Sequence, residues 1–475
     1  MMRATGLTLS LFAALVSTPA IAAGLTPDQY LEQVKTQNEE VKGAISSSEA
    51  SQRRSESASL ALAWSLYMNG GYKSDAKLYP LPFVTYGKVD YASYNVGFSK
   101  VTSFGLETKV GYSLMHTQYN GLNVPGVTGT VEFFDTTPMF EFKQSVWGNG
   151  FGRKTRADQE SAQATMLEGR FRSRNQARSL LIKAEETYWQ LALVRERVEV
   201  SKKALDQAEK IYAWAKRRSE NNLADDVDAL QAQAALEIRR VDLQTAEDDE
   251  RTASRMFNRF RNVDSDSVDD ALSEVGSDNL LVFNVPAIQP QRDDVKMAEM
   301  QQKGAAARAA SAAETYKPTL DVYGNYALNG RAAGLGQALG NPFQAGRPTW
   351  EVGFRFNMPL DRELASESVA GARQEQMAAE MILQQKLRDQ EQDWKELQRK
   401  IGELKNRLKM QQTLVSVQKT KLQRERERLK GGRTTTFQVL SFEQDFALSR
   451  LGEIGAKSAL VQAITQVKQY DGGAL

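Results

Sequence analysis

The sequence contains no cysteine, and it has a single histidine among 475 residues. Without cysteine the chain forms no disulfide and carries no lipid attached to a cysteine. One histidine, His116 at the end of a predicted strand, argues against Ser-His-Asp or Cys-His catalysis and against most zinc sites. The glycine-rich segment 334–340 joins two predicted strands, so it is not a phosphate-binding loop. We therefore expect a protein that is not an enzyme and has no cofactor and no metal.

An excess of charge of one sign is also lacking. The chain has 61 Lys and Arg against 59 Asp and Glu, which gives a formal net charge of +2. No basic footprint indicates nucleic acid as a partner. After the N-terminal segment, no stretch approaches the ~18 consecutive apolar residues of a membrane-spanning helix. If this chain crosses a membrane, a closed β-barrel is the remaining way to satisfy its backbone groups in lipid.

The first residues have the pattern of a secretory signal peptide. Arg3 precedes an apolar run from Leu7 to Val16, and the small-residue site Ala20-Ile21-Ala22 follows. We predict a signal peptide over residues 1–23, cut after Ala22 or Ala23. The alternative is a buried N-terminal helix, which the abrupt change to polar residues after this segment disfavours.

The rest of the chain alternates between long helical runs and segments with a period of two. Strands are predicted at about 64–147 and about 318–360, with a hairpin turn at 103–105. Helical hairpins are predicted at 154–262 and 362–469. The first run, to about residue 220, lacks proline and has a coiled-coil seam. At ~1.5 Å per residue it would span roughly 100 Å, which exceeds an ordinary globular domain.

These elements form an internal duplication. The first repeat is predicted to cover 24–262 and the second 293–475, each with a helix, strands and a helical hairpin, with a linker at 263–292. The helical turns NNLADD and GGRTTT correspond at an offset of 210 residues. The first repeat has an additional hairpin at 91–119, which either adds two crossings, and so two strands of a barrel, or folds outside the barrel. We favour the second interpretation.

The predicted strands have two unlike faces. The apolar face carries Tyr72, Tyr94, Phe98, Tyr112, Tyr326, Trp350, Phe354 and Phe356. The polar face carries Lys73, Glu107, Lys109, Glu141, Lys143, Asp321, Glu351 and Arg355. This pattern is typical of a lipid-facing wall around a water-filled lumen. Because so few strands cannot close a barrel, we expect several copies to share one. A soluble β-sandwich is the alternative, although such domains seldom extend into helices of this length.

The order of these elements resembles the TolC family of outer membrane channels. The matching segments are DVDALQAQ at 226–233, QRDDVKMAE at 291–299, KPTLDVYGNY at 317–326 and FNMPL at 356–360. The resemblance implies an α+β homotrimer with a shared 12-stranded barrel, about four strands per chain, and a long periplasmic coiled-coil tunnel.

It also implies a function, which is the outer membrane exit duct of a tripartite efflux pump or type I secretion system. The partners would be a periplasmic adaptor, an inner-membrane pump and outer membrane lipid. The alternative is a periplasmic coiled-coil adaptor or structural protein without a pore.

The resemblance assigns roles to residues at the two helical turns. Asn221, Asn222, Gly431 and Gly432 suit the backbone of tight turns and would dock the adaptor. The predicted entrance gate comprises Asp225, Asp226, Asp228, Arg433, Thr434 and Gln438. The lipid-facing aromatic girdle would comprise Tyr72, Tyr326, Trp350, Phe354 and Phe356.

The gate departs from the family pattern in two ways. Asp228 matches a position that holds the entrance shut, but Thr434 stands where the family has a basic partner, and Arg433 precedes it. Gln438 and Ser441 stand where members with an acidic ring carry Asp. Asp225 either adds charge to the entrance or caps the helix that begins there.

Overall fold

The computed structural model describes residues 24–77, 84–221, 225–286, 291–344 and 346–470. The predicted signal peptide and Asn222 lie outside these residues. The chain divides into two units that we describe separately. The helical unit comprises Met1–Ala44, Gln176–Pro290 and Asp393–Leu475, and the sheet unit comprises Ile45–Asn175 and Gln291–Gln392.

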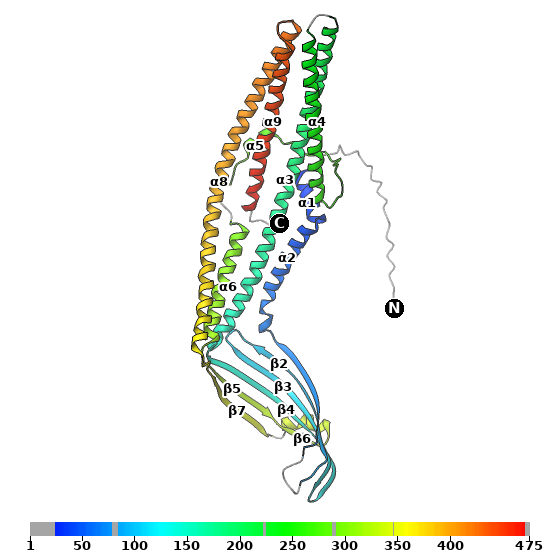
Figure 1. Ribbon diagram of the computed structural model, residues 1–475. Coiled ribbons are helices and arrows are strands. Elements are labelled where there is room, and N and C mark those ends of the chain that lie inside the picture. The colour runs from blue at the N-terminus through cyan, green and yellow to red at the C-terminus, as the bar shows by residue number, and fades with distance from the viewer. Residues whose placement is uncertain (1–23, 78–83, 222–224, 287–290, 345, 471–475) are drawn as a thin grey trace, which may run out of the picture. The chain divides into compact units, whose positions relative to one another are not determined.

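Helices make up most of the chain (Figure 1). They are α1 (Pro27–Gln37), α2 (Glu39–Glu56), α3 (Arg153–Glu220), α4 (Asp226–Phe260), α5 (Ser277–Val282), α6 (Asp293–Thr315), α7 (Leu335–Gln344), α8 (Arg362–Lys430) and α9 (Thr436–Val467). Short 3₁₀ helices cover Ser57–Leu62, Gly150–Gly152 and Lys468–Tyr470. In the described part of the chain, no helix is both long and apolar enough to span a membrane.

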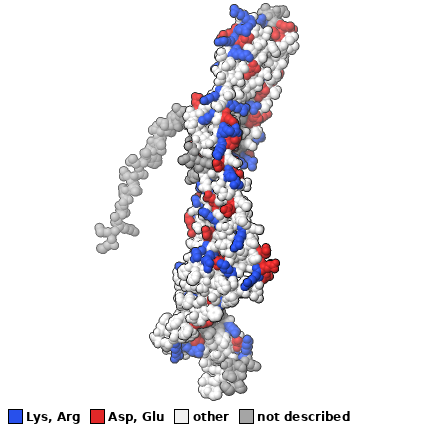
Figure 2. Space-filling view, turned by 90° about the vertical axis from the view of Figure 1, so that its left-hand side faces the viewer, with Lys and Arg blue, Asp and Glu red and all other residues white. Residues whose placement is uncertain are grey.

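The helices α3 and α8 bury the seams that their periodicity predicts. Along α3, Ala184, Tyr188 and Leu191 are fully buried. Along α8, Leu408 is fully buried and lies in one apolar cluster with Leu460 of α9. The outer faces are charged, and Figure 2 shows side chains of both signs interspersed over the helices. Exposed ion pairs of this kind contribute little to stability, so the seams hold the helices together.

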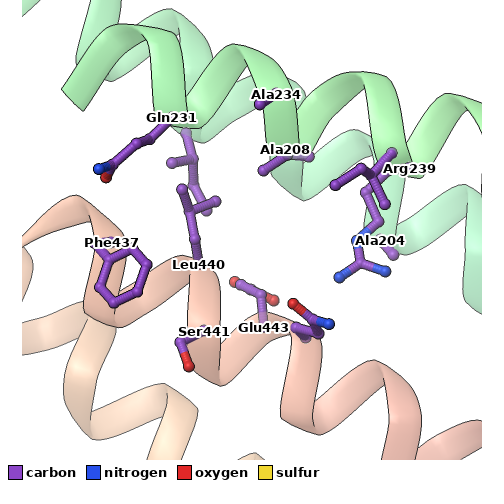
Figure 3. A pocket seen from close by; sticks show the side chains of 13 residues that line it. Ala204, Ala208, Gln231, Ala234, Arg239, Phe437, Leu440, Ser441 and Glu443 are labelled. Atoms are coloured by element: carbon purple, nitrogen blue, oxygen red, sulfur yellow. The ribbon is translucent and has the colours of Figure 1, made fainter. Parts of the chain in front are cut away.

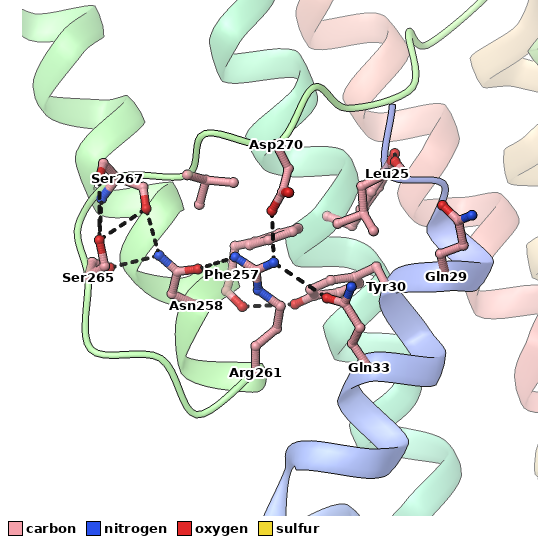
Figure 4. A network of polar contacts seen from close by, with 12 residues as sticks. Leu25, Gln29, Tyr30, Gln33, Phe257, Asn258, Arg261, Ser265, Ser267 and Asp270 are labelled. Atoms are coloured by element: carbon pink, nitrogen blue, oxygen red, sulfur yellow. Dashed lines mark hydrogen bonds and ion pairs between the residues drawn. The ribbon is translucent and has the colours of Figure 1, made fainter. Parts of the chain in front are cut away.

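Aromatic and polar contacts fix the chain where α4 ends. Tyr30 of α1 stacks on Phe257 of α4, with ring centres 4.2 Å apart, and its hydroxyl donates to the Phe257 carbonyl at 3.1 Å. Burial raises the pKa of Tyr30 to about 12. The buried amide of Asn258 donates to the carbonyls of Ser265 and Ser267, both at 2.9 Å (Figure 4). These bonds hold the acidic segment that follows α4 against the helices.

The strands form one antiparallel sheet in the sheet unit. They are β1 (Ser65–Asp75), β2 (Lys88–Val101), β3 (Leu106–Val124), β4 (Val127–Trp147), β5 (Thr319–Leu328), β6 (Gly330–Ala332) and β7 (Pro348–Asn357). Their order is β1-β2-β3-β4-β5-β7, and β6 pairs with β4. The predicted turn between β2 and β3 is confirmed, since Gly105 has a φ of 79° and its N–H donates to Thr102 at 2.9 Å.

The strand count corrects two expectations. The expected four or so strands per chain is too low, because the described residues contain six long strands and the short β6. The additional hairpin at 91–119 lies in β2 and β3, inside the sheet between β1 and β4, and does not fold outside it. The physical reason is that the alternation of β2 and β3 continues in register with that of their neighbours.

One face of the sheet carries an exposed apolar row that crosses all six long strands. Successive partners in register are Leu66, Phe98, Val110, Phe140, Tyr326 and Trp350. We call this set the apolar row. Every member is exposed, from 43% for Phe140 to 72% for Trp350. The predicted girdle residues Tyr72, Phe354 and Phe356 are exposed as well.

On the opposite face, glycines make room for aromatic side chains. Tyr67 of β1 lies over Gly97 of β2 and Gly111 of β3, because its hydroxyl occupies the space that a Cβ of either glycine would need. Tyr323 of β5 lies over Gly353 of β7 in the same way. The sheet therefore needs small residues at these positions for the aromatic side chains of this face to pack.

Candidate functional site: the helical turns and the charged face of the sheet

The first helical turn lies between α3 and α4. The Asn221 side-chain amide donates to the Arg217 carbonyl at 2.7 Å. Asp225 is the N-cap of α4, since its carboxylate accepts from the Val227 N–H at 3.1 Å. Of the two alternatives for Asp225, capping is thus confirmed. The Asp226 carboxylate accepts a hydrogen bond from the Ser219 hydroxyl, which ties the start of α4 to the end of α3.

The second turn lies between α8 and α9 and depends on Gly432. Its φ is 68°, a left-handed conformation that favours glycine. The Gly432 N–H donates to Leu429 at 3.0 Å and the Arg433 N–H donates to Arg428 at 2.9 Å, which closes the end of α8. Thr435 caps α9 and accepts from the Gln438 N–H at 3.3 Å. Gln438 therefore lies in the first turn of α9.

Thr434 is held inside its own hairpin. Its hydroxyl donates to the carboxylate of Glu425, whose other oxygen accepts from Arg428 at 3.1 Å. Glu425 is only 5% exposed. The sequence analysis missed this buried acid, although its spacing of three residues from Arg428 on one helix was a visible signal.

The suspected link between Asp228 and Arg433 is absent from the single chain. Among the described residues no ion pair joins them. The Arg433 carbonyl instead accepts from Arg428 at 3.4 Å. Asp228 lies half-buried in the first turn of α4. A gating contact of Asp228 therefore stays a prediction that requires a neighbouring chain.

A groove lies beside these turns, between α3, α4 and α9, with a volume of about 330 Å³. Small, apolar and polar side chains line it, and Arg239 and Glu443 extend into the space between the helices (Figure 3). The lining residues are Ala204, Ala208, Ile211, Gln231, Ala234, Ala235, Ile238, Arg239, Phe437, Leu440, Ser441, Glu443 and Gln444. Ser441, which the sequence analysis placed at the gate, thus lies on the groove wall.

Glu443 is the titratable group of this groove that the sequence analysis missed. The Arg426 guanidinium donates to its carboxylate, with Nε 2.8 Å from Oε1. Burial nevertheless raises the pKa of Glu443, with Arg426 and Arg239 opposing the shift. An acid with a raised pKa contributes stability below the ordinary carboxyl range and loses it as pH rises through the raised value. The basic neighbours Arg426 and Arg239 favour the charged form of Glu443 against the effect of burial.

The sheet presents a second candidate site on its polar face. Seven of the eight charged residues predicted for this face line one hollow of about 370 Å³. We call them the charged patch: Glu107, Lys109, Glu141, Lys143, Asp321, Glu351 and Arg355. Four are acidic and three are basic, so the patch has one excess negative charge. The eighth residue, Lys73, pairs with Asp75 at 2.8 Å.

Direct contacts order the charged patch. Lys143 pairs with Glu107 at 2.8 Å, and the Tyr323 hydroxyl donates to Glu351 at 3.2 Å. The Arg355 guanidinium lies 5.7 Å from the centre of the Tyr323 ring. Such an arrangement can attract and select ions in water. The described residues contain no group of three or more His, Cys, Asp or Glu side chains that could hold a metal.

Known proteins resemble this chain in structure. No family model matches the sequence, and no curated protein matches it either. The structure of CusC matches with a TM-score of 0.65 at 16% identity, over 94% of this chain and 92% of that chain. The outer membrane protein VceC of Vibrio cholerae matches with a TM-score of 0.63 at 14% identity, over 94% and 96%.

The open state of the MtrE outer membrane channel of Neisseria gonorrhoeae gives a TM-score of 0.61 at 16% identity, over 94% of this chain and 89% of that chain. These matches cover the helices and the sheet together. The resemblance to the TolC family is thus confirmed at the level of the fold.

Proposed function

We propose that this protein is an outer membrane channel, the exit duct of a tripartite efflux pump or type I secretion system. The observation that carries the proposal is the apolar row in a chain with the fold of outer membrane channels. Trp350 at its end is 72% exposed, and Phe354 on the same strand is 75% exposed. A continuous apolar band of this size is a liability in water and a requirement in lipid.

The edges of the sheet support assembly from several copies. In the described part of the chain, β1 and β7 each have a single strand neighbour. Open edges of this length pair with other chains. If three copies close one barrel, each copy contributes six long strands. The barrel then has 18 strands, instead of the 12 that the family resemblance implies.

The helices support the same assembly. On α4 an apolar stripe is exposed in the single chain, with Val227 at 53%, Leu230 at 63%, Ile238 at 57% and Val241 at 64%. Separations of three, eight and three residues keep these side chains on one side of the helix. We infer that a neighbouring copy covers this stripe and that α3, α4, α8 and α9 of three copies form a periplasmic tunnel.

The turns would then lie at the entrance of this tunnel. Asn221, Asn222, Gly431 and Gly432 would dock the periplasmic adaptor, which links the tunnel to an inner-membrane pump. Asp225, Asp226, Asp228, Arg433, Thr434 and Gln438 would surround the entrance. The signal peptide at 1–23 would send the chain across the inner membrane, and the charged patch would face the water-filled lumen.

Electron microscopy of the detergent-purified full chain tests this proposal. Particles with three-fold symmetry, and 18 strands at the membrane end, are the expected result. Small monomers or elongated dimers would contradict the shared barrel. They would favour the alternative, a periplasmic coiled-coil adaptor or structural protein without a pore.

A further inference from the structure

The helix α7 lies on the same face of the sheet as the apolar row. Two side chains of that face hold it by its backbone. The Thr136 hydroxyl of β4 donates to the Ala338 carbonyl at 2.5 Å, and the Tyr112 hydroxyl of β3 donates to the Leu339 carbonyl at 3.0 Å. Tyr112 and Thr136 alternate in step with Val110 and Phe140 of the apolar row. The helix therefore rests on the apolar side of the sheet.

Close packing fixes which side of α7 meets the sheet. Ala338 and Pro342 are the buried residues of the helix. A Cβ at Gly330 of β6 would lie 2.5 Å from the Pro342 ring, so only glycine permits this approach. The amide of Asn341 donates to the Arg331 carbonyl at 3.1 Å. The rotation of the helix about its own axis is thus set by contacts on three strands.

With that rotation, α7 exposes a stripe of large apolar side chains. Leu335, Leu339 and Phe343 recur every four residues, and they are 43%, 44% and 68% exposed. Gln337 and Gln344 point to the opposite side, about half a turn away at 100° per residue. The helix contains no charged residue. It therefore has an exposed apolar side and a neutral polar side.

We propose that α7 is an interfacial helix that lies in the headgroup–acyl boundary of the outer membrane, with Leu335, Leu339 and Phe343 in the lipid. This proposal rests on the proposed function, because it takes the apolar row to face lipid. Lipid is the expected contact of this stripe, because the stripe lies on the same face of the sheet as the apolar row and continues its apolar surface. An amphipathic helix with one apolar side and one polar side suits that boundary.

Single-cysteine labelling tests this position, because the chain has no cysteine of its own. Leu339→Cys, Gln337→Cys and Phe354→Cys variants of the full chain would each carry a nitroxide label. They would be reconstituted in vesicles of phosphatidylethanolamine and phosphatidylglycerol. The anchoring hydrogen bonds accept at backbone carbonyls, so Leu339→Cys leaves them in place. Phe343→Cys serves as a second variant should Leu339→Cys not fold.

The measurement is the accessibility of each label to oxygen, which enters lipid, and to a nickel chelate, which stays in water. We expect the oxygen-to-nickel ratio to be several-fold higher at Leu339 and Phe354 than at Gln337. A lipid value at Phe354 with a water value at Leu339, or a Leu339 label shielded from both reagents, would overturn the inference and leave the proposed function standing. A water value at Phe354 would overturn both.

Discussion

Gly432 marks the residue where the chain reverses between α8 and α9. Its left-handed backbone has a φ of 68°, and no atom lies within 4 Å of the place where a Cβ would stand. A side chain there would meet no neighbour, so the energetic cost of a substitution would come from the left-handed backbone alone. The preceding Gly431 has no positive φ, and a Cβ there would meet the Arg428 carbonyl at an ordinary 3.5 Å. The two adjacent glycines thus differ in what they tolerate.

We expect Gly432→Val to abolish export while the oligomer still assembles. A β-branched residue in the left-handed region costs about 1–3 kcal/mol, enough to reshape the turn but not to unfold the long helices. Export of a toxic compound by cells that depend on this channel gives the readout, and cross-linking reports the oligomer. Gly431→Ala is the matched comparison within the same turn, and it should retain more export than Gly432→Val because Gly431 has no left-handed backbone. Normal export by Gly432→Val would refute a docking role for this turn.

Some residue roles could be predicted from the sequence, and others could not. The N-cap of α4 at Asp225 follows from local chemistry, since an Asp before a helix satisfies a free N–H of the first turn. The burial of Glu425 and the pairing of Glu443 with Arg426 depend on the rotation of one long helix against another. A small error in that rotation moves a side chain from the surface to the interior, so the sequence alone did not identify these residues.

At the scale of elements, the join between β1, β2 and β3 depends on Tyr67 and two glycines. A Cβ at Gly97 would lie 2.5 Å from the Val110 carbonyl oxygen and 2.7 Å from the Cα of Gly111, both of which are backbone atoms. A Cβ at Gly111 would first meet the Tyr67 hydroxyl, with the Val96 carbonyl at a tolerable 3.2 Å. The Tyr67 hydroxyl constrains both glycines, since it lies 2.6 Å from a Cβ at Gly97 as well, and Gly97 is constrained by backbone atoms in addition.

A double-mutant cycle separates these two constraints. We expect Gly111→Ala to destabilise the sheet by about 1 kcal/mol and Gly97→Ala by about 2 kcal/mol or more, as in overpacked cores. Tyr67→Phe removes the hydroxyl, so it should cancel most of the cost of Gly111→Ala but only part of the cost of Gly97→Ala, where the backbone contacts remain. The temperature at which the sheet signal is lost in circular dichroism measures each effect. If Gly111→Ala destabilised the Tyr67→Phe protein as much as the parent protein, the packing described here would be contradicted.

The elements themselves were largely predictable, and the strand count was not. Period-two alternation located the strands, and the seam of α3 through Tyr188 and Leu191 located a helical core. Alternation reports which side chains share a face, but not which strand lies beside which. The hairpin of β2 and β3 was therefore placed outside the sheet, whereas its apolar residues Phe98 and Val110 continue the row of β1 and β4.

At the scale of the whole molecule, the charged patch predicts the ion preference of the proposed channel. It has one excess negative charge per chain, and Arg355 is one of its three basic residues. We expect Arg355→Gln to increase the preference for cations over anions, because it leaves a second negative charge per chain uncompensated. The reversal potential in a KCl gradient across a planar bilayer measures this preference.

Arg355→Lys is the matched control for this prediction. It keeps the charge and removes the stacking of the guanidinium on Tyr323. Its reversal potential should stay near that of the parent. A shift in Arg355→Lys as large as that in Arg355→Gln would assign the effect to the shape of the patch, contrary to the electrostatic explanation.

The two edges of the sheet also determine how the protein reaches its final state. Within the described residues, β1 and β7 each leave one row of backbone groups without a strand partner. If neighbouring copies supply the missing partners, the last step of folding is an encounter between chains, and its rate rises with their concentration. Before it assembles, a newly made chain would then have two unpaired edge strands and an exposed apolar row. To avoid aggregation before assembly, the chain would require either a chaperone that covers the edges and the apolar row, or synthesis fast enough for further copies to pair with it first.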